Sequence, residues 1–501
     1  MADYSQFPSP TGHGMARPHL VKLNLIILSL LMYSGSQGYD GSLMNCLQTL
    51  TQWQIFMNYP VGTWLGFINA LPTIGSLVFL PAQAWVSDRL GRRVSLWVGI
   101  LFSIIGAGVQ ASAHSPGTFI VGRLFIGIST AWFAASAVLI TEIAYPSHRA
   151  KCTALYNCQF YVGSVIAAWV TYGVRNMEGS WAWRIPSLLQ IAIPILALSG
   201  TIFAPESPRW LVANDRSDEA QAIIAKYHAG GPLDDPRVLF EINEIKQSIL
   251  TELEAMRTTT YGDMVRTKGN RRRMFITITL GVFGQWVGNG VVSFYLSLIL
   301  STVGITSVTQ QTLLNGFLNV WNLFMSVGAA LMVDNIGRRK LFFSSGIIML
   351  LSYVIITALS AEFANHGTKA VGTAVIPFLF IFFGGFDIGF TPLVIAYTAE
   401  IWPFSFRARG VAICLWSTSA AGLFNIFVNP IALAAIQWRY YVIFIAVQLL
   451  WLIAVYFRYP ETRAYTLEEM TIVFDGEGDK TKAVNNEIQV KEASFAHNEN
   501  I

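Results

Sequence analysis

An acidic residue stands within the first apolar stretch of the chain. Asp40 follows the largely apolar run 23–32 and belongs to the segment 35–41, Gly-Ser-Gln-Gly-Tyr-Asp-Gly. An ionised carboxylate near the middle of a bilayer costs on the order of 2.5–3.5 kcal/mol even on lenient insertion scales, so such a residue is usually functional. The three glycines allow a neighbouring backbone or a ligand to approach closely. We interpret Asp40 as the proton-binding group of a membrane transporter.

A basic residue in another apolar stretch is the natural partner of this acid. Arg123 lies in the segment 121–127, near the expected external end of that stretch. A buried guanidinium needs an anion, and few acids besides Asp40 are available in the N-terminal membrane region. A nearby Arg favours the ionised carboxylate, and separation in a low dielectric disfavours it. The pair could therefore link protonation to conformation; a permanent salt bridge is the alternative interpretation.

Composition indicates that these residues belong to a polytopic membrane protein. Of 501 residues, 53% are apolar and only 12% are charged, about half the charged fraction of an ordinary soluble domain. The net charge of +4 is too small to indicate nucleic-acid binding. Three of the four cysteines are expected in or beside helices on the cytosolic side, which does not indicate a disulfide framework.

Twelve apolar segments are long enough to span a bilayer, which takes about 20 residues. They lie near 20–46, 62–86, 93–113, 117–143, 150–175, 184–204, 272–301, 311–334, 340–361, 370–401, 408–435 and 438–458. We therefore predict an all-α membrane protein of two six-helix bundles, 20–204 and 272–459. A cytosolic linker with short helices, 205–271, joins them, and the tails 1–19 and 460–501 are expected to be disordered.

The distribution of basic residues predicts the orientation. Lys and Arg are concentrated in the loops between spans 2 and 3, 4 and 5, 8 and 9, and 10 and 11, whereas the opposite loops carry few. Because cytosolic loops carry the excess of basic residues, we place both termini and the linker in the cytosol. We expect the plasma membrane as the location.

Three motifs recur in the two halves, roughly 250 residues apart. Asp88-Arg-Leu-Gly-Arg-Arg93 returns as Asp334-Asn-Ile-Gly-Arg-Arg339, and the Glu142…Arg149 segment returns as Glu400…Arg407. Pro205-Glu-Ser-Pro-Arg209 returns as Pro460-Glu-Thr-Arg463. Three matches in the same order indicate two parallel repeats of six helices.

These motifs resemble those of the sugar porters of the major facilitator superfamily, over residues 20 to about 470. The resemblance implies that the motifs form a cytosolic charge network that locks the halves in the outward-facing state. Simple topology signalling is the alternative for several of these residues. The network would contain Asp88, Arg89, Arg92, Glu142, Arg149, Glu206, Arg209, Asp334, Arg338, Arg339, Glu400, Arg407 and Glu461.

The same resemblance implies that Asp40 and Arg123 form the coupling pair of a proton-coupled sugar porter. Sugar hydroxyls need groups that both donate and accept hydrogen bonds, as amides do, and aromatic rings stack on sugar C–H faces. Several amides share helical faces at i, i+4 and i+7 spacing. The sugar-binding candidates are Asn157, Tyr161, Ser164, Gln285, Asn289, Tyr295, Asn315, Asn319, Asn322, Asp387, Trp416 and Asn425. Hydrogen bonding between helices is the alternative for each amide.

Small residues replace larger ones at three positions of the hexose-porter pattern: Gly284, Ser164 and Ile395. This suggests room for a larger ligand. The strings 38–41, 284–289 and 181–186 are most similar to fungal lactose-permease-like and cellodextrin transporters. We therefore expect a proton-coupled symporter for a disaccharide or short oligosaccharide such as lactose or cellobiose, working by alternating access.

Asp387 is a second acid within an apolar segment, and three roles fit it: binding sugar hydroxyls, binding a second proton, or capping a helix break. The alternatives for the whole chain are a hexose or pentose transporter, a facilitative uniporter and a non-transporting sugar sensor. No catalytic, metal-binding or cofactor-binding motif is recognisable, so an enzyme is not expected. The expected partners are a sugar, a proton and the lipid bilayer, and a monomer would suffice.

Overall fold

The structure is a computed structural model that describes residues 17–146, 149–463, 470 and 473–475. The predicted tails lie largely outside these residues. Twelve helical spans confirm the predicted fold class. Ten stretches of the described residues are long and apolar enough to cross a membrane; one of them, Ser405–Arg458, covers two spans, and the span Arg149–Val174 is not among the ten.

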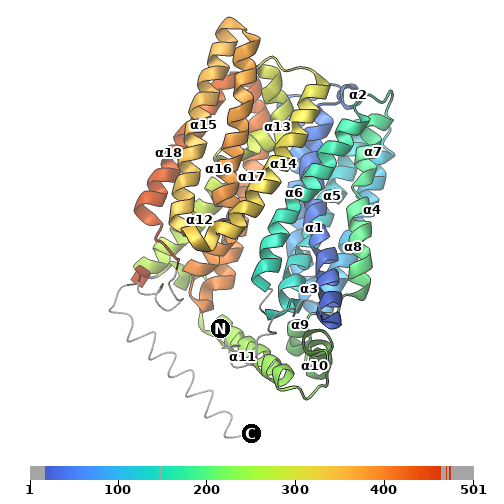
Figure 1. Cartoon of the computed structure of the whole chain (residues 1–501), viewed down its shortest axis with the longest axis vertical. Helices are drawn as coiled ribbons and strands as arrows, with labels where there is room; N and C mark the ends of the chain where they lie inside the picture. Colours follow the sequence, from blue (N-terminus) through green and yellow to red (C-terminus); the bar gives the residue numbers. More distant parts are fainter. Residues whose placement is uncertain (1–16, 147–148, 464–469, 471–472, 476–501) are drawn as a thin grey trace.

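The first six spans form one bundle and the last six form the other. Figure 1 shows the two bundles side by side. The N-terminal spans are α1 (Pro18–Gln48), α3 (Gly62–Leu90), α4 (Arg92–Ala111), α5 (Pro116–Ile143), α6 (Arg149–Val174) and the pair α7 (Trp181–Leu189) and α8 (Ala192–Phe203). The C-terminal spans are the pair α12 (Lys268–Trp286) and α13 (Asn289–Thr302), then α14 (Val308–Ile336), α15 (Arg338–His366), α16 (Lys369–Ile401), α17 (Phe404–Ile436) and α18 (Tyr440–Arg458).

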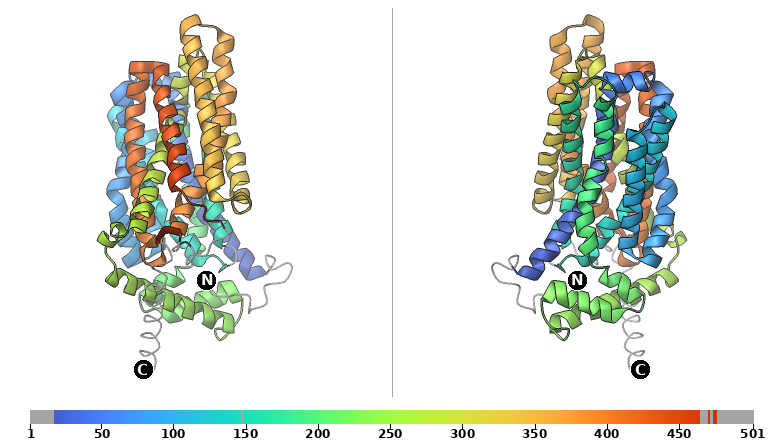
Figure 2. Two further views of the ribbon diagram at one scale, coloured as in Figure 1. Left: turned by 90° about the vertical axis from the view of Figure 1, so that its left-hand side faces the viewer. Right: turned by 90° about the vertical axis from the view of Figure 1, so that its right-hand side faces the viewer.

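Short helices lie at the ends of the bundles. The linker contains α9 (Pro208–Ala213), α10 (Ser217–Ile224), α11 (Pro236–Thr258) and two short turns, Ala225–Ala229 and Gly262–Val265. It lies at the end of the molecule where α1 begins and α18 ends (Figure 2). At the opposite end lie α2 (Thr51–Phe56) and the turn Gln437–Arg439. The chain ends of the membrane region and the linker thus share one side, and its assignment to the cytosol stays a prediction.

The first repeated motif forms the same turn in both halves. Gly91 separates α3 from α4 with φ +102°, and Gly337 separates α14 from α15 with φ +98°. A residue with a side chain is strained at such angles. A Cβ on Gly337 would also lie 2.8 Å from the Glu461 carboxylate, and a Cβ on Gly91 would collide with that of Glu206. The repeat seen in the sequence is therefore a repeat of backbone geometry.

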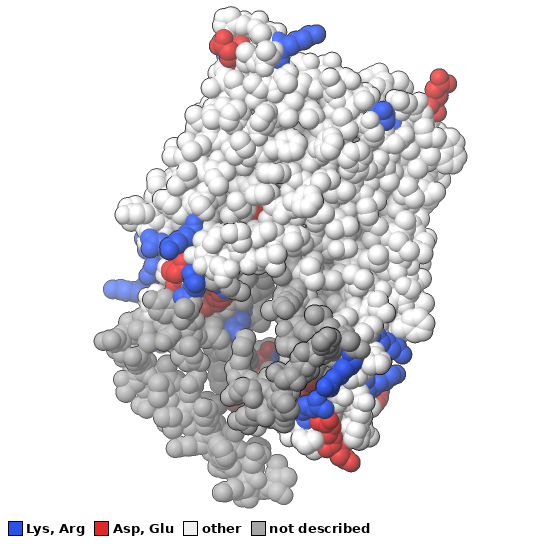
Figure 3. All heavy atoms as spheres, viewed as in Figure 1, with Lys and Arg blue, Asp and Glu red and all other residues white. Residues whose placement is uncertain are grey.

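Two symmetry-related helix pairs hold the halves together. α6 packs against α14, and α3 packs against α17; in the repeat, spans 2 and 5 correspond to spans 8 and 11. α1 additionally contacts α13. Large apolar side chains such as Leu25, Val78 and Leu331 are exposed on the flanks, where Figure 3 shows few charges between the charged ends. Such a flank suits a lipid environment.

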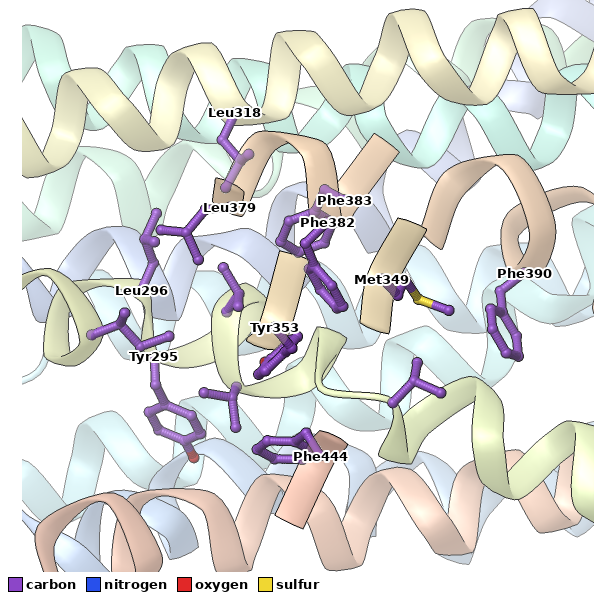
Figure 4. Packing of buried hydrophobic residues seen from close by; sticks show 14 of the residues in the cluster. Tyr295, Leu296, Leu318, Met349, Tyr353, Leu379, Phe382, Phe383, Phe390 and Phe444 are labelled. Atoms are coloured by element: carbon purple, nitrogen blue, oxygen red, sulfur yellow. The ribbon is translucent and has the colours of Figure 1, made fainter. Parts of the chain in front are cut away.

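An aromatic core fixes the broken seventh span. The chain leaves helical geometry at Gly288, which has φ +106°, and again at Tyr295. The ring of Tyr353 packs edge-on against Phe382, 4.8 Å between centroids, and lies against Phe444 (Figure 4). Its hydroxyl donates to the Gly288 carbonyl at 2.9 Å. Neighbouring spans therefore supply hydrogen bonds that the break removes from the helix.

Candidate functional site

Close packing of α1 on α6 positions Asp40. A Cβ on Gly38 would overlap the Phe160 backbone, and a Cβ on Gly163 would overlap the Gly35 carbonyl. The glycines therefore let the two backbones touch. Ser164 strengthens this contact, because its fully buried hydroxyl donates to the Gly38 carbonyl at 3.0 Å. Ser164, predicted as a sugar ligand, is used in this conformation for helix packing.

Asp40 and Arg123 are in direct contact. The Arg123 Nη1 lies 2.6 Å from the Asp40 Oδ1, and Arg123 is only 3% exposed. α5 begins with Pro116 at its first turn, and Arg123 lies about two turns further, within the bundle. Among the described residues, Arg123 Nε has no hydrogen-bond partner. The sequence therefore identified two residues from different helices that the fold brings together in an apolar interior.

A cavity of about 290 Å³ adjoins this ion pair. Its walls come from both halves: α1, α3, α5 and α6 on one side, and α13 and α17 on the other. Polar lining groups include Gln37, Asn69 and Thr73, besides the ion pair itself. Phe160 and Phe294 add aromatic surface. A cavity between rigid halves, with few polar groups and aromatic walls, has the form of a small-molecule site.

The amides predicted on the eighth span lie outside the cavity, and one of them, Asn315, contacts another helix. Asn315 accepts a hydrogen bond from Asn45 of α1 at 3.2 Å and donates to the Cys46 sulfur at 3.1 Å. Asn319 donates to the Asn315 carbonyl at 2.9 Å. Asn322 is buried, with an Oδ1 that has no partner among the described residues. None of the three lines the 290 Å³ cavity.

The candidates on the seventh and eleventh spans are also mostly engaged within the C-terminal half. Asn425 donates to the Gln285 carbonyl at 2.6 Å, and Tyr295 donates to the Ile426 carbonyl at 2.6 Å. Asn289 is buried on α13, Asn157 is half-buried on α6, and Trp416 is 60% exposed. The sugar-binding role of these residues stays a prediction.

Asp387 makes a contact between the halves. It is fully buried on α16, and its Oδ1 accepts hydrogen bonds from Tyr161 of α6 at 2.5 Å and from Thr391 at 2.8 Å. Its Oδ2 has no partner among the described residues. Tyr161 and Asp387, two of the predicted sugar ligands, therefore contact one another across the halves.

The repeated motifs build the same charge cluster twice. Arg92 donates to Glu142 at 3.1 Å, and Glu206 accepts the backbone N–H groups of Arg92 and Arg93. In the second half Arg338 donates to Glu400 at 2.9 Å, and Glu461 accepts the N–H groups of Arg338 and Arg339. Each of these clusters joins residues of one half.

Other predicted members of the network have separate contacts. Asp88 pairs with Arg92 at 3.2 Å, Arg209 pairs with Glu252 of the linker at 2.5 Å, and Arg89 lies over the Trp85 ring. Arg149 begins α6, and Arg407 lies in the first turn of α17. The side chain of Asp334 lies outside the described residues.

Sequence reasoning missed the residue that docks the linker. His228 Nδ1 lies 2.9 Å from the Glu241 carboxylate of α11, and its Nε2 lies 3.0 Å from the carbonyl of Ile143 at the end of α5. The imidazole therefore joins the linker to the residue next to Glu142. No motif in the sequence indicates this contact.

The halves are joined toward the end that lies away from the linker. Gln48, at the end of α1, donates to the Phe294 carbonyl at 3.0 Å. Arg175, just after α6, donates to Thr309 at the start of α14 at 3.1 Å. With Asn45 and Asn315, these contacts connect the halves on the predicted external side of the cavity.

Comparison with known proteins identifies the family. Residues 27–474 match the family model described as "Sugar (and other) transporter". The chain belongs to this sugar transporter family. It is therefore a multi-pass membrane transporter and not an enzyme.

Relatives of this sugar transporter include fungal proteins. It is 30% identical over 415 residues to the MFS-type transporter oryC of Aspergillus oryzae, covering 81% of this chain and 76% of the relative. It is 26% identical over 477 residues to a high-affinity glucose transporter of Kluyveromyces lactis, covering 90% and 85%.

Solved structures confirm the fold of the sugar transporter. The inward-open conformation of the xylose transporter XylE from E. coli superposes with a TM-score of 0.74 at 21% identity, covering 90% of this chain and all of XylE. XylE bound to 6-bromo-6-deoxy-D-glucose superposes with a TM-score of 0.70 at 22% identity. The twelve-helix architecture is that of the major facilitator superfamily.

Proposed function

We propose that this transporter is a proton-coupled sugar symporter in which Asp40 carries the proton. The observation that supports the proposal most is the Asp40–Arg123 ion pair in the wall of a cavity between the halves. A structural neighbour, XylE, is named a proton:xylose symporter. We propose in addition that the protein described here lies in the plasma membrane with both of its termini in the cytosol.

The ion pair can link protonation to movement of the helices. A carboxylate holds the Arg123 guanidinium by charge and by a hydrogen bond, so the pair ties α5 to α1. When Asp40 accepts a proton, the carboxyl becomes neutral and this attraction largely disappears. Arg123 then needs another acceptor, which favours a different arrangement of the helices. Protonation thereby shifts the balance between two conformations by the difference in their proton affinity.

The doubled charge clusters supply the second part of the mechanism. In the described conformation they lie within the halves, so they hold each half as a rigid body. We propose that when the cavity opens to the outside, the clusters approach one another and their partners change between halves. Rearrangement of several charge-assisted bonds can supply the few kcal/mol that select one state.

Two substrate classes remain candidates for this site. The motif strings resembling lactose-permease-like and cellodextrin transporters favour a disaccharide or short oligosaccharide such as lactose or cellobiose. The relatives named glucose and hexose transporters favour a hexose. Uptake of labelled lactose, cellobiose and D-glucose in yeast lacking its own sugar carriers distinguishes the two.

The coupling is tested with Asp40→Asn and with a protonophore. We expect wild-type uptake to be uphill and abolished by the protonophore. Asp40→Asn should abolish accumulation but retain exchange of labelled for unlabelled sugar, because the neutral amide mimics the protonated acid. Glu362→Gln, an exposed acid near the end of α15, is the matched control. Unchanged accumulation by Asp40→Asn would refute the role of Asp40.

The same assay separates the alternatives. Protonophore-insensitive equilibration would identify a facilitative uniporter. Absence of uptake of every sugar tested, with normal delivery to the cell surface, would favour a sugar sensor.

A further inference from the structure

We propose that Asn69 of α3 is a sugar-binding residue, one that hydrogen-bonds a ligand hydroxyl from the N-terminal wall of the cavity. This inference rests on the proposed function, because it takes a neutral sugar as the ligand. It concerns the cavity beside the ion pair and not the amides of the seventh, eighth and eleventh spans. Asn69 then contributes to sugar selectivity, whereas Asp40 binds the proton.

The buried amide of Asn69 lacks well-formed hydrogen bonds. The residue is 5% exposed, and among the described residues neither its Oδ1 nor its Nδ2 makes a hydrogen bond. The Tyr295 hydroxyl lies close enough to interact with this amide. Because its proton goes to the Ile426 carbonyl at 2.6 Å, it can only accept from the Asn69 Nδ2 and leaves the Oδ1 without a donor in the described part of the chain. An unsatisfied buried polar group costs on the order of 1–3 kcal/mol. A polar side chain left unsatisfied in the wall of a cavity is well placed to hydrogen-bond a ligand.

Asn69 belongs to a polar face of an otherwise apolar helix. Asn69, Thr73 and Ser76 follow one another at i, i+4 and i+7, and all three line the cavity. That spacing places side chains on one helical face. Pro72, between them, packs so closely on α5 that a Cβ on Gly127 would overlap its backbone. The contact with α5 keeps this face of α3 turned into the cavity.

The remaining walls suit a polyhydroxylated ring. Phe160 of α6 and Phe294 of α13 present aromatic surface from the two halves. Gln37 donates to the Thr130 carbonyl at 3.3 Å, which orients its amide at the cavity wall. An amide that can donate and accept at once matches the hydroxyl of a sugar, which does the same. A charged ligand is less suited, because the ion pair already neutralises the site.

Asn69 lies where the two halves meet, so a sugar bound to it would be affected when the halves move together or apart. α3 belongs to the N-terminal half, whereas Tyr295, Phe294 and Ile426 belong to the C-terminal half. Gly66, one turn before Asn69, is so close to α17 that a Cβ there would lie 2.7 Å from the Phe427 carbonyl. A sugar held between Asn69 and the C-terminal half would therefore bind best when these surfaces are together.

The test determines which sugar hydroxyl forms the hydrogen bond with Asn69. Full-length protein in proteoliposomes is assayed by counterflow of labelled D-glucose, which needs no proton gradient, with 2-deoxy-, 3-deoxy- and 6-deoxy-D-glucose as competitors. We expect Asn69→Ala to raise the half-saturating D-glucose concentration about tenfold, as for the loss of one hydrogen bond. One deoxy analogue should show the same loss in the wild type and no further loss in Asn69→Ala.

Controls separate binding from folding and from coupling. Asn69→Ser, which keeps a small polar group, should fall between the wild type and Asn69→Ala, and Asn365→Ala, at an exposed position near the end of α15, should match the wild type. Proton-driven accumulation at saturating D-glucose should survive in Asn69→Ala, whereas Asp40→Asn loses it. If every deoxy analogue loses affinity equally in the wild type and in Asn69→Ala, the contact does not exist. If wild-type protein transports neither glucose nor any disaccharide, the proposed function and this inference both fail.

Discussion

At the scale of single residues, Asp40 compensates the cost of burying the charge of Arg123. Both side chains lie in the protein interior, 2.6 Å apart. Removal of one partner from a buried ion pair leaves an uncompensated charge and typically destabilises by 3–5 kcal/mol, whereas removal of both can be nearly neutral. The pair is therefore best examined by removing its members singly and together.

We predict that Asp40→Asn lowers the thermal unfolding midpoint and that the double variant Asp40→Asn with Arg123→Gln partly restores it. The reason is that the amide pair is neutral and can still hydrogen-bond. Thermal unfolding in detergent, followed by tryptophan fluorescence, gives the midpoints. If the losses of Asp40→Asn and Arg123→Gln simply add in the double variant, the two side chains are not coupled.

Residue chemistry explains which site members could be predicted. Asp40 and Arg123 stand out because a charge in an apolar segment is costly, so the sequence alone marks them. The proposed sugar ligand Asn69 was not predicted, although Asn69, Thr73 and Ser76 have the same i, i+4, i+7 spacing as the eighth-span amides. The eighth-span amides are more striking in sequence, but in the structure Asn315 serves a contact with α1. Spacing identifies a shared face and not what that face meets.

At the scale of elements, Gly337 does two things: it allows the turn between α14 and α15, and it leaves room for the Glu461 carboxylate. Its φ of +98° excludes most side chains, and its closeness to Glu461 lets that carboxylate accept the next two backbone N–H groups. The start of α15 therefore has a side-chain cap from the chain segment after α18. The same design holds for Gly91 and Glu206 at the start of α4.

We predict that Gly337→Ala destabilises the C-terminal half by about 1–3 kcal/mol from backbone strain alone, with a further loss if Glu461 is displaced. Gly328→Ala is the control, since it lies within helix α14 and a Cβ there meets no atom within 4 Å. Thermal midpoints in detergent and the amount of protein at the cell surface report the effect. Equal midpoints for both variants would contradict the strain at this turn.

Element boundaries show where sequence reasoning reaches its limit. Twelve apolar segments were predictable because each must hide its backbone from lipid. The interruptions at residues 190–191 and 287–288 were not predicted, since apolar composition continues across them. Gly288 and Gly290 flanking Asn289 were a signal, but glycine alone does not distinguish a break from close helix packing.

At the scale of the whole molecule, the inter-half contacts decide which conformation is populated. Near the middle of the spans the contact between Tyr161 and Asp387 adds one hydrogen bond to the packing of α6 against the C-terminal half. Such bonds exist only while the halves are together. Each therefore adds its free energy to one conformation and not to the other.

We predict that Tyr161→Phe shifts the population toward separated halves by roughly fivefold, the equivalent of about 1 kcal/mol. Spin labels at Leu155 of α6 and Ile395 of α16, both exposed, report the separation by electron–electron distance measurement. Tyr156→Phe is the matched control, because Tyr156 bonds Ser136 within one half. Identical distance distributions in the two variants would exclude Tyr161 as an inter-half tie.

The sequence predicted that the two halves are alike, but not which of their faces pack together. Repeated motifs predicted two like bundles, because each motif returns in the matching loop. They carry no information on which faces meet, since this depends on side chains that lie far apart in the chain. The pairing of Tyr161 with Asp387, 226 positions apart, is visible only once the halves are packed.

The break at Gly288 has a mechanical consequence for the contacts between α1 and α13. In a continuous helix, tilting an end stretches backbone hydrogen bonds, and the helix resists as a stiff rod. Here Gln448 donates to the Val287 carbonyl at 2.6 Å and Tyr353 donates to the Gly288 carbonyl at 2.9 Å, so side chains of other spans already hold the backbone groups at the break. We therefore expect α13 to change its angle to α12 at this break without distorting either helix. The resistance to this movement would then come from the hydrogen bonds that Asn45 and Gln48 of α1 make with α13, rather than from the stiffness of the span.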